Sequence, residues 1–428
     1  MRILFAALAC LLSFTAQAGV KIEHWLAPSG ARVYFVENHD LPILDVEVDF
    51  SAGSAYDPSG KAGLAGLTAA LLDAGAGDLD EEAIAAQLVD LGAKLSGVRE
   101  PDRAGLVLRT LAYPKEREAA LALLQLVLTR PSFPENVVTR EKARSIAAIQ
   151  EADTRPDAIA AKRFAAAIYP DHPYGVKATV ESVGSLTRDD LTAFYRSHYS
   201  ARRAVVSIIG DVTRAEAERI AQALTEALPA GQAEQPLPPV SQPTAATIKV
   251  AHPAAQSHIH IGLPAVKRGD PDYFPLLVGN YSLGGGGFVS RLMKEVREKR
   301  GYAYSVHSYF SPRKLEGPFD IGLQTKREQA EDALKVANDV LAGFLKDGPT
   351  KAELAAAKKN LIDGLGLRID SNAKLLGYLS VIGFFDLPLT YLDDFPASVG
   401  AVTAQQVREA FARHVRPEHL MTVIVAAD

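Results

Sequence analysis

The sequence contains a single cysteine, Cys10, and no apolar run long enough to span a membrane. The apolar stretch 3–14 falls short of the roughly 20 residues that a spanning helix needs. Because Cys10 lies within that stretch, the rest of the chain can form neither disulfides nor thiolate metal sites. Basic clusters are lacking too. The 46 Lys and Arg residues against 51 Asp and Glu residues leave a net charge of −5, which argues against binding to nucleic acid or anionic membranes.

The N-terminus has the pattern of a secretory signal. Arg2 precedes the apolar stretch 3–14, and residues 16–18 (Ala-Gln-Ala) form a small-residue cleavage site. We expect residues 1–18 to be removed and the mature chain to be periplasmic in a bacterium. A lipoprotein attached at Cys10 is the less favoured alternative, because the residues before it fit a lipobox poorly.

A proline-rich segment divides the mature chain into two halves of similar size. Residues 229–243 include five prolines and one charged residue, a composition that sustains neither a helix nor a central strand. We therefore expect an N-terminal domain at 19–228, a linker at 229–244 and a C-terminal domain at 245–428.

The two halves share a pattern that indicates an internal duplication. Residues 186–209 and 402–425 each begin with a threonine-capped amphipathic helix, pass through a histidine and end in an apolar strand. One large offset favours a duplicated domain over a solenoid of short repeats. The histidines, His198 and His414, occupy equivalent positions, which favours a shared structural role over a catalytic one.

Strand and helix patterns both occur within each half. Residues 31–36 and 43–50 have strand patterns, and residues 81–91, 115–128 and 136–151 have helical periodicity. Strand runs followed by helix runs predict an α+β fold. We expect two homologous domains, each a largely antiparallel sheet with helices packed on it.

Two motifs that could bind a ligand are weak. No two of the 10 histidines stand three or four positions apart, so no helical His pair can hold a metal. His258 and His260 would share one strand face, and we interpret them as a solvated or hydrogen-bonded pair. The four glycines at 284–287 lack the Gly-Lys-Ser/Thr of a phosphate loop, so nucleotide binding is not expected.

Residues 63–72 read Gly-Leu-Ala-Gly-Leu-Thr-Ala-Ala-Leu-Leu. This segment, with its flanks, resembles the active-site helix of the pitrilysin/insulinase family of zinc peptidases, which carries an inverted His-x-x-Glu-His motif. Here Gly66 and Ala70 stand at the His positions and Ala69 at the Glu position, while Ala147 stands where the family has its distal Glu ligand. The resemblance implies that this chain alone has neither a zinc site nor a general base.

The resemblance extends over nearly all of the mature chain. Residues 171–175 (Asp-His-Pro-Tyr-Gly) resemble the end of the family's first domain, 283–292 its glycine-rich loop, and 296–306 its Arg-to-Tyr segment. It implies that Arg297 and Tyr304 reach the active site of a zinc centre and help to hold substrate. It also implies that the glycine-rich loop lines the peptide chamber; its glycines are Gly284, Gly285, Gly286 and Gly287.

The local sequence makes this role of Arg297 and Tyr304 reasonable. Arg297 borders a helical apolar stripe of Val289, Leu292, Met293 and Val296. Gly301 should end that helix, and the following strand pattern should place Tyr304 near the helix end. A guanidinium and a phenol are suitable donors to a peptide carbonyl or to the oxyanion that develops on it. Without the resemblance, we would interpret Arg297 as a solvated charge and Tyr304 as a core residue.

We therefore expect the non-catalytic subunit of a periplasmic heterodimeric zinc peptidase. This chain would bind no cofactor. A homologous partner would carry the zinc, and the two subunits would close like a clamshell around unfolded peptides. The chain is similar in this to the non-metal-binding subunits of heterodimeric bacterial members and of mitochondrial processing peptidase. The alternatives are a pseudopeptidase with only a structural or peptide-binding role, and a homodimeric peptide binder.

Overall fold

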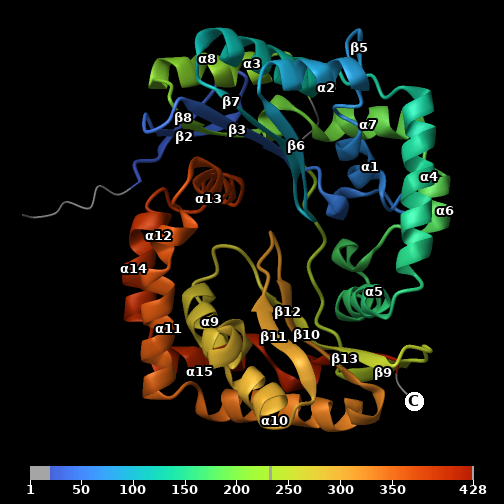
Figure 1. The fold of residues 1–428 in the computed structure, drawn as a ribbon, viewed down its shortest axis with the longest axis vertical. Coiled ribbons are helices and arrows are strands. Elements are labelled where there is room, and N and C mark those ends of the chain that lie inside the picture. Colours follow the sequence, from blue (N-terminus) through green and yellow to red (C-terminus); the bar gives the residue numbers. More distant parts are fainter. Residues whose placement is uncertain (1–19, 231–233, 427–428) are drawn as a thin grey trace, which may run out of the picture.

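The computed structural model describes residues 20–230 and 234–426 (Figure 1). The signal predicted at residues 1–18 lies outside the described residues. Two sheets with helices packed on them make up the molecule, so the predicted α+β class is confirmed. Among the described helices, none combines the length and the apolar character that crossing a membrane requires.

Each sheet takes all its strands from one half of the chain. The first sheet has the order β1 (Glu23–Leu26), β2 (Arg32–Glu37), β8 (Val205–Gly210), β3 (Ile43–Phe50), β7 (Ala104–Leu111) and β6 (Lys94–Arg99). The second has the order β11 (Ala303–Phe310), β12 (Gly317–Lys326), β10 (Gln256–Val266), β13 (Met421–Val425) and β9 (Ala246–Val250). In these two sheets only β2–β8 and β9–β13 pair in parallel.

The two sheets repeat one topology. The run β2-β8-β3-β7-β6 corresponds strand by strand to β9-β13-β10-β12-β11, including the single parallel pair. Helices α7 (Arg188–His198) and α15 (Ala404–His414) precede the equivalent strands β8 and β13, and each starts with a threonine capping box. The internal duplication predicted from the sequence is therefore present in the fold.

The equivalent histidines make equivalent contacts. His198 Nδ1 lies 3.0 Å from the carbonyl of Ser51, and His414 Nδ1 lies 2.8 Å from the carbonyl of Ala265. Each bond joins the end of a helix to the chain at the end of a neighbouring strand. Both residues therefore have the structural role that their positions in the repeat predicted.

The remaining helices pack around the two sheets. In the first half they are α1 (Leu64–Ala70), α2 (Glu81–Asp90), α3 (Pro114–Thr129), α4 (Glu135–Ala152), α5 (Pro156–Ile168), α6 (Val180–Gly184) and α8 (Arg214–Thr225), with a small hairpin of β4 (Gly75–Ala76) and β5 (Leu79–Asp80). In the second half they are α9 (Tyr273–Asn280), α10 (Ala330–Asp347), α11 (Lys351–Asp363), α12 (Leu365–Arg368), α13 (Asn372–Phe384) and α14 (Tyr391–Ala401). The helices predicted at 81–91, 115–128 and 136–151 are α2, α3 and α4.

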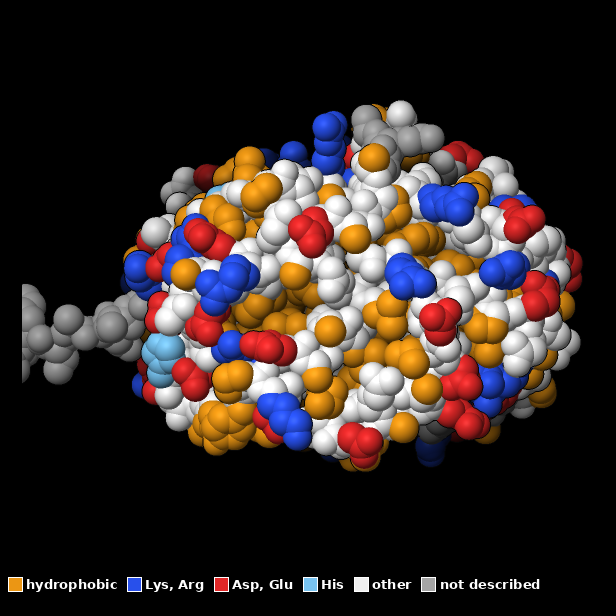
Figure 2. Space-filling model, turned by 90° about the horizontal axis from the view of Figure 1, so that it is seen from above, with side chains coloured by type: hydrophobic (Ala, Val, Ile, Leu, Met, Phe, Trp, Pro, Cys, Tyr) orange, Lys and Arg blue, Asp and Glu red, His pale blue; other side chains and the backbone are white. Residues whose placement is uncertain are grey.

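The outer face of the first sheet is covered by α3 and α8. These helices lie at the top of Figure 1, and Figure 2 looks down on them. A groove of about 260 Å³ runs between them, with Leu121 and Ile220 in its lining and Arg117 and Arg219 among its charged residues. Figure 2 shows apolar side chains in this hollowed middle and charged ones around it.

One helix from each half packs on the sheet of the other half. Helix α5 packs on β10 and β13 of the second sheet, where Phe164 and Ile168 join a core with Val423. Helix α13 packs on β2, β3 and β8 of the first sheet, where Leu379 joins a core with Ile209. Figure 1 shows α13 beneath the first sheet and α5 beside the second. This exchange buries β8 on both faces, and all of its residues are buried.

A buried arginine fastens α13 to the first sheet. Arg103, in the turn between β6 and β7, donates from Nη1 to Asp49 at 2.9 Å and to Ser380 of α13 at 2.6 Å. Its Nε and Nη2 donate to the two oxygens of Glu100, each at 3.0 Å. Glu47 lies 3.4 Å from Nη1. Burial, with only one guanidinium among three carboxylates, raises the pKa of Asp49 well above its usual value and also raises the pKa of Glu47.

The same turn also contacts the second sheet. Asp102 is 2% exposed and accepts hydrogen bonds from the Tyr174 hydroxyl and, at 2.9 Å, from the backbone amide of Lys314. Lys314 lies in the connection between β11 and β12. Residues 100–103 therefore join the first half to two separate segments of the second half.

The predicted linker, 229–244, has no helix or strand among its described residues. It lies against both halves: the carbonyl of Pro238 is 2.9 Å from His172 Nε2, and Gln242 donates to the carbonyl of Pro264 at 3.0 Å. Since every strand of one sheet precedes this segment and every strand of the other follows it, we propose it as the domain boundary.

Substitutions in the Arg103 cluster should separate two effects. Arg103→Ala should reduce the free energy of unfolding by about 3–5 kcal/mol, because the buried carboxylates of Asp49 and Glu47 lose the guanidinium that pairs with them. Asp49→Asn should instead reduce the pH dependence of stability. The raised folded-state pKa of Asp49 favours its protonated form, so its stabilising contribution is greatest below the unfolded pKa of about 3.9 and declines as pH rises toward the folded pKa.

Urea unfolding at pH 5 and pH 8 measures this difference. The wild-type chain should lose more stability between the two pH values than Asp49→Asn does. The matched control is Asp40→Asn in an exposed loop, which should behave like the wild type. An Asp49→Asn variant with the same pH dependence as the wild type would contradict the assignment.

Candidate functional site

The helix that carries the degenerate metal motif is held by one carboxylate. Asp57 accepts hydrogen bonds from the backbone amides of Gly63, at 2.8 Å, and Ala65, at 2.6 Å, where α1 begins. A negative charge at this end also suits the helix dipole. Burial raises the pKa of Asp57 to about 6. Helix α1 therefore forms where the motif predicts it.

The four motif positions carry no group that could bind a metal or move a proton. Gly66 opens onto a cleft of about 250 Å³, and a Cβ atom placed on it would meet no atom within 4 Å. Ala69 is 3% exposed, Ala70 is half-buried, and Ala147 lies exposed on α4. Hydrogen and methyl side chains have no lone pairs, so these positions provide neither zinc ligands nor a general base.

The strand pair of histidines has ordinary structural partners. His260 Nδ1 lies 3.0 Å from both carboxylate oxygens of Asp320, and the ring stacks on Phe164 of α5 at 5.2 Å. Burial lowers the pKa of His258. The pair is at least partly a hydrogen-bonded one, as we interpreted it from the sequence.

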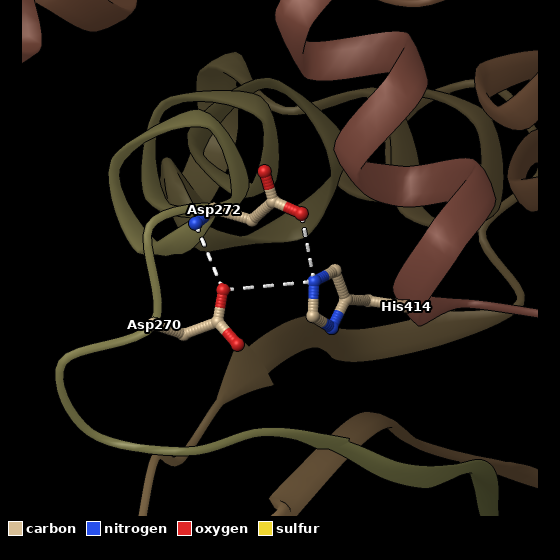
Figure 3. A group of neighbouring side chains, drawn as sticks. All are labelled: Asp270, Asp272 and His414. Atoms are coloured by element: carbon tan, nitrogen blue, oxygen red, sulfur yellow. Dashed lines mark hydrogen bonds and ion pairs between the residues drawn. The ribbon is translucent and has the colours of Figure 1, made fainter.

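A group that the sequence did not predict is formed by Asp270, Asp272 and His414 (Figure 3). His414 Nε2 lies 2.9 Å from Asp272 and 3.8 Å from Asp270. Arg413, however, binds both oxygens of Asp272, at 2.8 and 2.7 Å, and lowers its pKa. We interpret the group as a polar network between α15 and the start of α9, because Arg413 and His414 already occupy the oxygens of Asp272.

Arg297 and Tyr304 lie together, as their spacing predicted. Gly301, with φ of +66°, ends the helical segment and β11 begins at Ala303. The guanidinium of Arg297 lies between two rings, 4.7 Å from the centre of Tyr304 and 4.8 Å from that of Phe288. It makes no hydrogen bond or ion pair with a side chain in residues 20–230 or 234–426. The sequence reasoning missed Phe288, whose only signal is its place directly after the glycines.

This arrangement holds a cation without neutralising it. Aromatic rings attract a guanidinium through their faces and leave its N–H donors free. Tyr304 is 84% exposed and Phe288 60% exposed, so the group faces solvent. Its use in substrate binding remains a prediction.

The glycine-rich segment begins within a π-helical turn. It follows a helix, α9, which runs on into a π-helical turn at Tyr281–Gly285. A second π-helical turn, Met293–Glu298, carries Arg297. The prediction that Val289 belongs to the apolar stripe is wrong, because its side chain is 51% exposed. The other three members of the stripe are buried.

Close packing explains at least one of the glycines. A Cβ atom on Gly284 would lie 2.4 Å from Ser308 Oγ and 2.6 Å from the Ser308 amide on β11. Asn280 makes two hydrogen bonds with the same serine. Its side-chain amide donates to the carbonyl of Ser308 at 2.8 Å, and its side-chain oxygen accepts from the Ser308 hydroxyl at 2.6 Å. Gly284 thus lets the π-helical turn approach β11, while a peptide-lining role of 284–287 stays a prediction.

Comparison with known proteins places both halves in one group. Residues 32–179 match the family described as Insulinase (Peptidase family M16), and residues 185–361 match the family described as Peptidase M16 inactive domain. The chain is 25% identical to the non-peptidase homolog YmxG of Helicobacter pylori over 96% of this chain and 95% of that protein. It is 31% identical to the uncharacterized zinc protease SCO5738 of Streptomyces coelicolor over 68% of this chain, but spans only 64% of that protein.

Solved structures agree with this assignment. A peptidase M16 inactive domain from Pseudomonas fluorescens superposes with a TM-score of 0.91 at 36% identity, covering 95% of this chain and 98% of that one. The periplasmic protease PqqL of Escherichia coli has a TM-score of 0.80 at 17% identity, covering 95% of this chain and 45% of that one. The second likeness is evidence for the fold alone.

Metal analysis tests the degenerate motif. The purified chain should contain far less than one zinc ion per molecule and should hydrolyse no peptide, as measured by plasma mass spectrometry and a quenched-fluorescence peptide assay. Gly66→His combined with Ala70→His should not restore activity, because Ala69 and Ala147 still lack carboxylates. Stoichiometric zinc with chelator-sensitive hydrolysis in the unmodified chain would overturn this interpretation.

Proposed function

Because the chain belongs to the insulinase family of peptidases, family M16, we propose that it is the non-catalytic subunit of a periplasmic heterodimeric zinc metallopeptidase. A homologous partner supplies the zinc and the general base. This chain supplies Arg297, Tyr304 and the glycine-rich loop 284–287. The observation that carries the proposal is the contrast between α1, which has no ligand groups, and Arg297, which has an uncommitted guanidinium on the surface.

The chemistry of Arg297 supports a substrate role. An arginine that serves only structure commonly binds a carboxylate, as Arg291 does with Glu353 at 2.8 and 2.7 Å in the same half. Arg297 is instead positioned by two rings, so its donors are available to a peptide carbonyl or to the oxyanion formed during hydrolysis. The Tyr304 hydroxyl, on an almost fully exposed side chain, adds a neutral donor beside it.

The position of β11 supports peptide binding. It is the outermost strand of the second sheet, so one side of its backbone has no strand partner within that sheet. An extended peptide can add to such an edge by main-chain hydrogen bonds. Tyr304 and Tyr309 are exposed on this strand, with Phe288 nearby, and aromatic side chains offer contact area to unfolded segments of varied sequence.

The periplasmic location and the partner rest on indirect support. The predicted signal at 1–18 is one line of support, and the structural neighbour described as a periplasmic protease is another. A duplicated two-domain chain without a metal site is consistent with one half of a clamshell whose other half is catalytic.

A different function is favoured by one specific observation. The relative described as a non-peptidase homolog matches almost the whole chain. A pseudopeptidase with a purely structural or peptide-binding role, alone or as a homodimer, would show the same degenerate motif. It would not need Arg297 and Tyr304 for turnover by a partner.

Kinetics of the co-purified pair distinguish the two functions. In a complex with a homologue that carries the complete zinc motif, Arg297→Ala should lower kcat/KM by about 10- to 150-fold, since a charge-assisted hydrogen bond contributes roughly 1.5–3 kcal/mol. Tyr304→Phe keeps the ring that holds Arg297 and loses only a neutral donor, so it should cost about 1 kcal/mol.

Arg300→Ala is the matched control. Arg300 lies one turn beyond Arg297 and bonds to Glu295 at 2.8 Å, so its loss should change kcat/KM little. Heterodimer assembly and zinc content, measured by size-exclusion chromatography and metal analysis, should be unchanged in all three variants. Full activity of both site variants would refute the substrate role and favour the purely structural subunit.

A further inference from the structure

The cleft beside α1 contains two cations that are not committed to an ion pair. Arg99, at the end of β6, and Lys177, after the turn that follows α5, line it together with Gly66. Neither cation makes an ion pair or a side-chain hydrogen bond with any residue of the described ranges. Glu100 also lines the cleft, but both of its oxygens accept hydrogen bonds from Arg103, each at 3.0 Å.

Two cations without an ion pair therefore line the cleft. Arg103 holds both oxygens of Glu100, whereas neither Arg99 nor Lys177 is bonded to a carboxylate of the described residues. Burial, followed by the charge of Arg313, lowers the pKa of the Lys177 ammonium. An anion in the cleft would be attracted by both Arg99 and Lys177.

The cleft also has room for a ligand. Its volume is about 250 Å³, and Gly66 contributes no side chain to its wall. Ser54 adds a hydroxyl to the lining, a neutral donor that suits a carboxylate oxygen. A carboxylate with the residue that bears it fits this space and chemistry, whereas a metal cation would meet two positive charges and no free carboxylate.

We propose that this cleft is a carboxylate-binding subsite for peptides, in which Arg99 and Lys177 bind the anion beside the degenerate metal motif. The ligand is the C-terminal carboxylate of a peptide or the side chain of an internal Asp or Glu. The subsite goes beyond the proposed function, because it lies in the first half, apart from Arg297 and Tyr304, and needs neither a partner nor catalysis.

Binding of labelled peptides to the chain alone tests the subsite. Fluorescence anisotropy compares three versions of one ten-residue peptide: a free C-terminus, an amidated C-terminus without acidic residues, and an amidated C-terminus with one internal Asp. We expect the amidated peptide without acidic residues to bind at least about tenfold more weakly than one or both of the others, since charge-assisted hydrogen bonds are lost. The two acidic versions distinguish a terminal from a side-chain carboxylate.

Variants locate the binding. Lys177→Ala and Arg99→Ala should each weaken binding of the acidic peptide by about tenfold, whereas Lys94→Ala, an exposed cation on the same strand outside the cleft, should not. Gly66→Glu should abolish binding by placing a carboxylate in the cleft.

Three results would overturn the proposal: equal affinity for acidic and non-acidic peptides, unchanged affinity of both cation variants, or no binding of any peptide. None of these bears on Arg297 or on the activity of a heterodimer. Failure of the subsite and failure of the proposed function are therefore distinguishable.

Discussion

The turn at residues 100–103 is the contact on which the arrangement of the two halves depends. Its Arg103 binds α13 of the second half through Ser380, and its Asp102 binds the β11–β12 connection, also of the second half. Both side chains are buried, so water does not compete for these bonds. The exchange of α5 and α13 brings apolar cores to the same junction. Relative motion of the halves would break both the polar contacts and the two exchanged cores, so the chain behaves as one unit although it arose by duplication.

This rigidity explains how the chain keeps its architecture without a metal. The cleft beside Gly66 is formed by α1, the β6–β7 turn and the segment around Lys177. Arg297 and Tyr304 are presented by the π-helical turn and β11, which pack on each other in the second half. Neither site depends on zinc for its geometry: Asp57 holds α1, and Asn280 holds the glycine-rich turn against Ser308. Loss of the metal ligands therefore leaves the surrounding architecture in place.

The sequence predicted the local structure and the family better than it predicted the contacts between distant segments. Periodicity, threonine caps and the repeat identified α2, α3, α4, α7 and α15, several strands and the α+β class, because these signals are local. The sequence could not predict which sheet α5 and α13 pack against. An apolar helix face indicates that the helix is buried, but it does not indicate which sheet covers it. The same limit applies to Asp272 and His414, which are far apart in the sequence, and to Phe288, whose contact depends on a π-helical turn that mimics an ordinary helix in periodicity.

The residues around α1 differ from a metal site in more than the missing ligands. Zinc ligands require lone pairs, and the motif positions have none, because alanine and glycine occupy them. Arg99 and Lys177 line the same cleft, and Glu100 is bound by Arg103. Ligands restored at the motif positions would therefore stand beside two cations that repel a divalent ion. Those cations make recovery of zinc binding by one or two substitutions unfavourable.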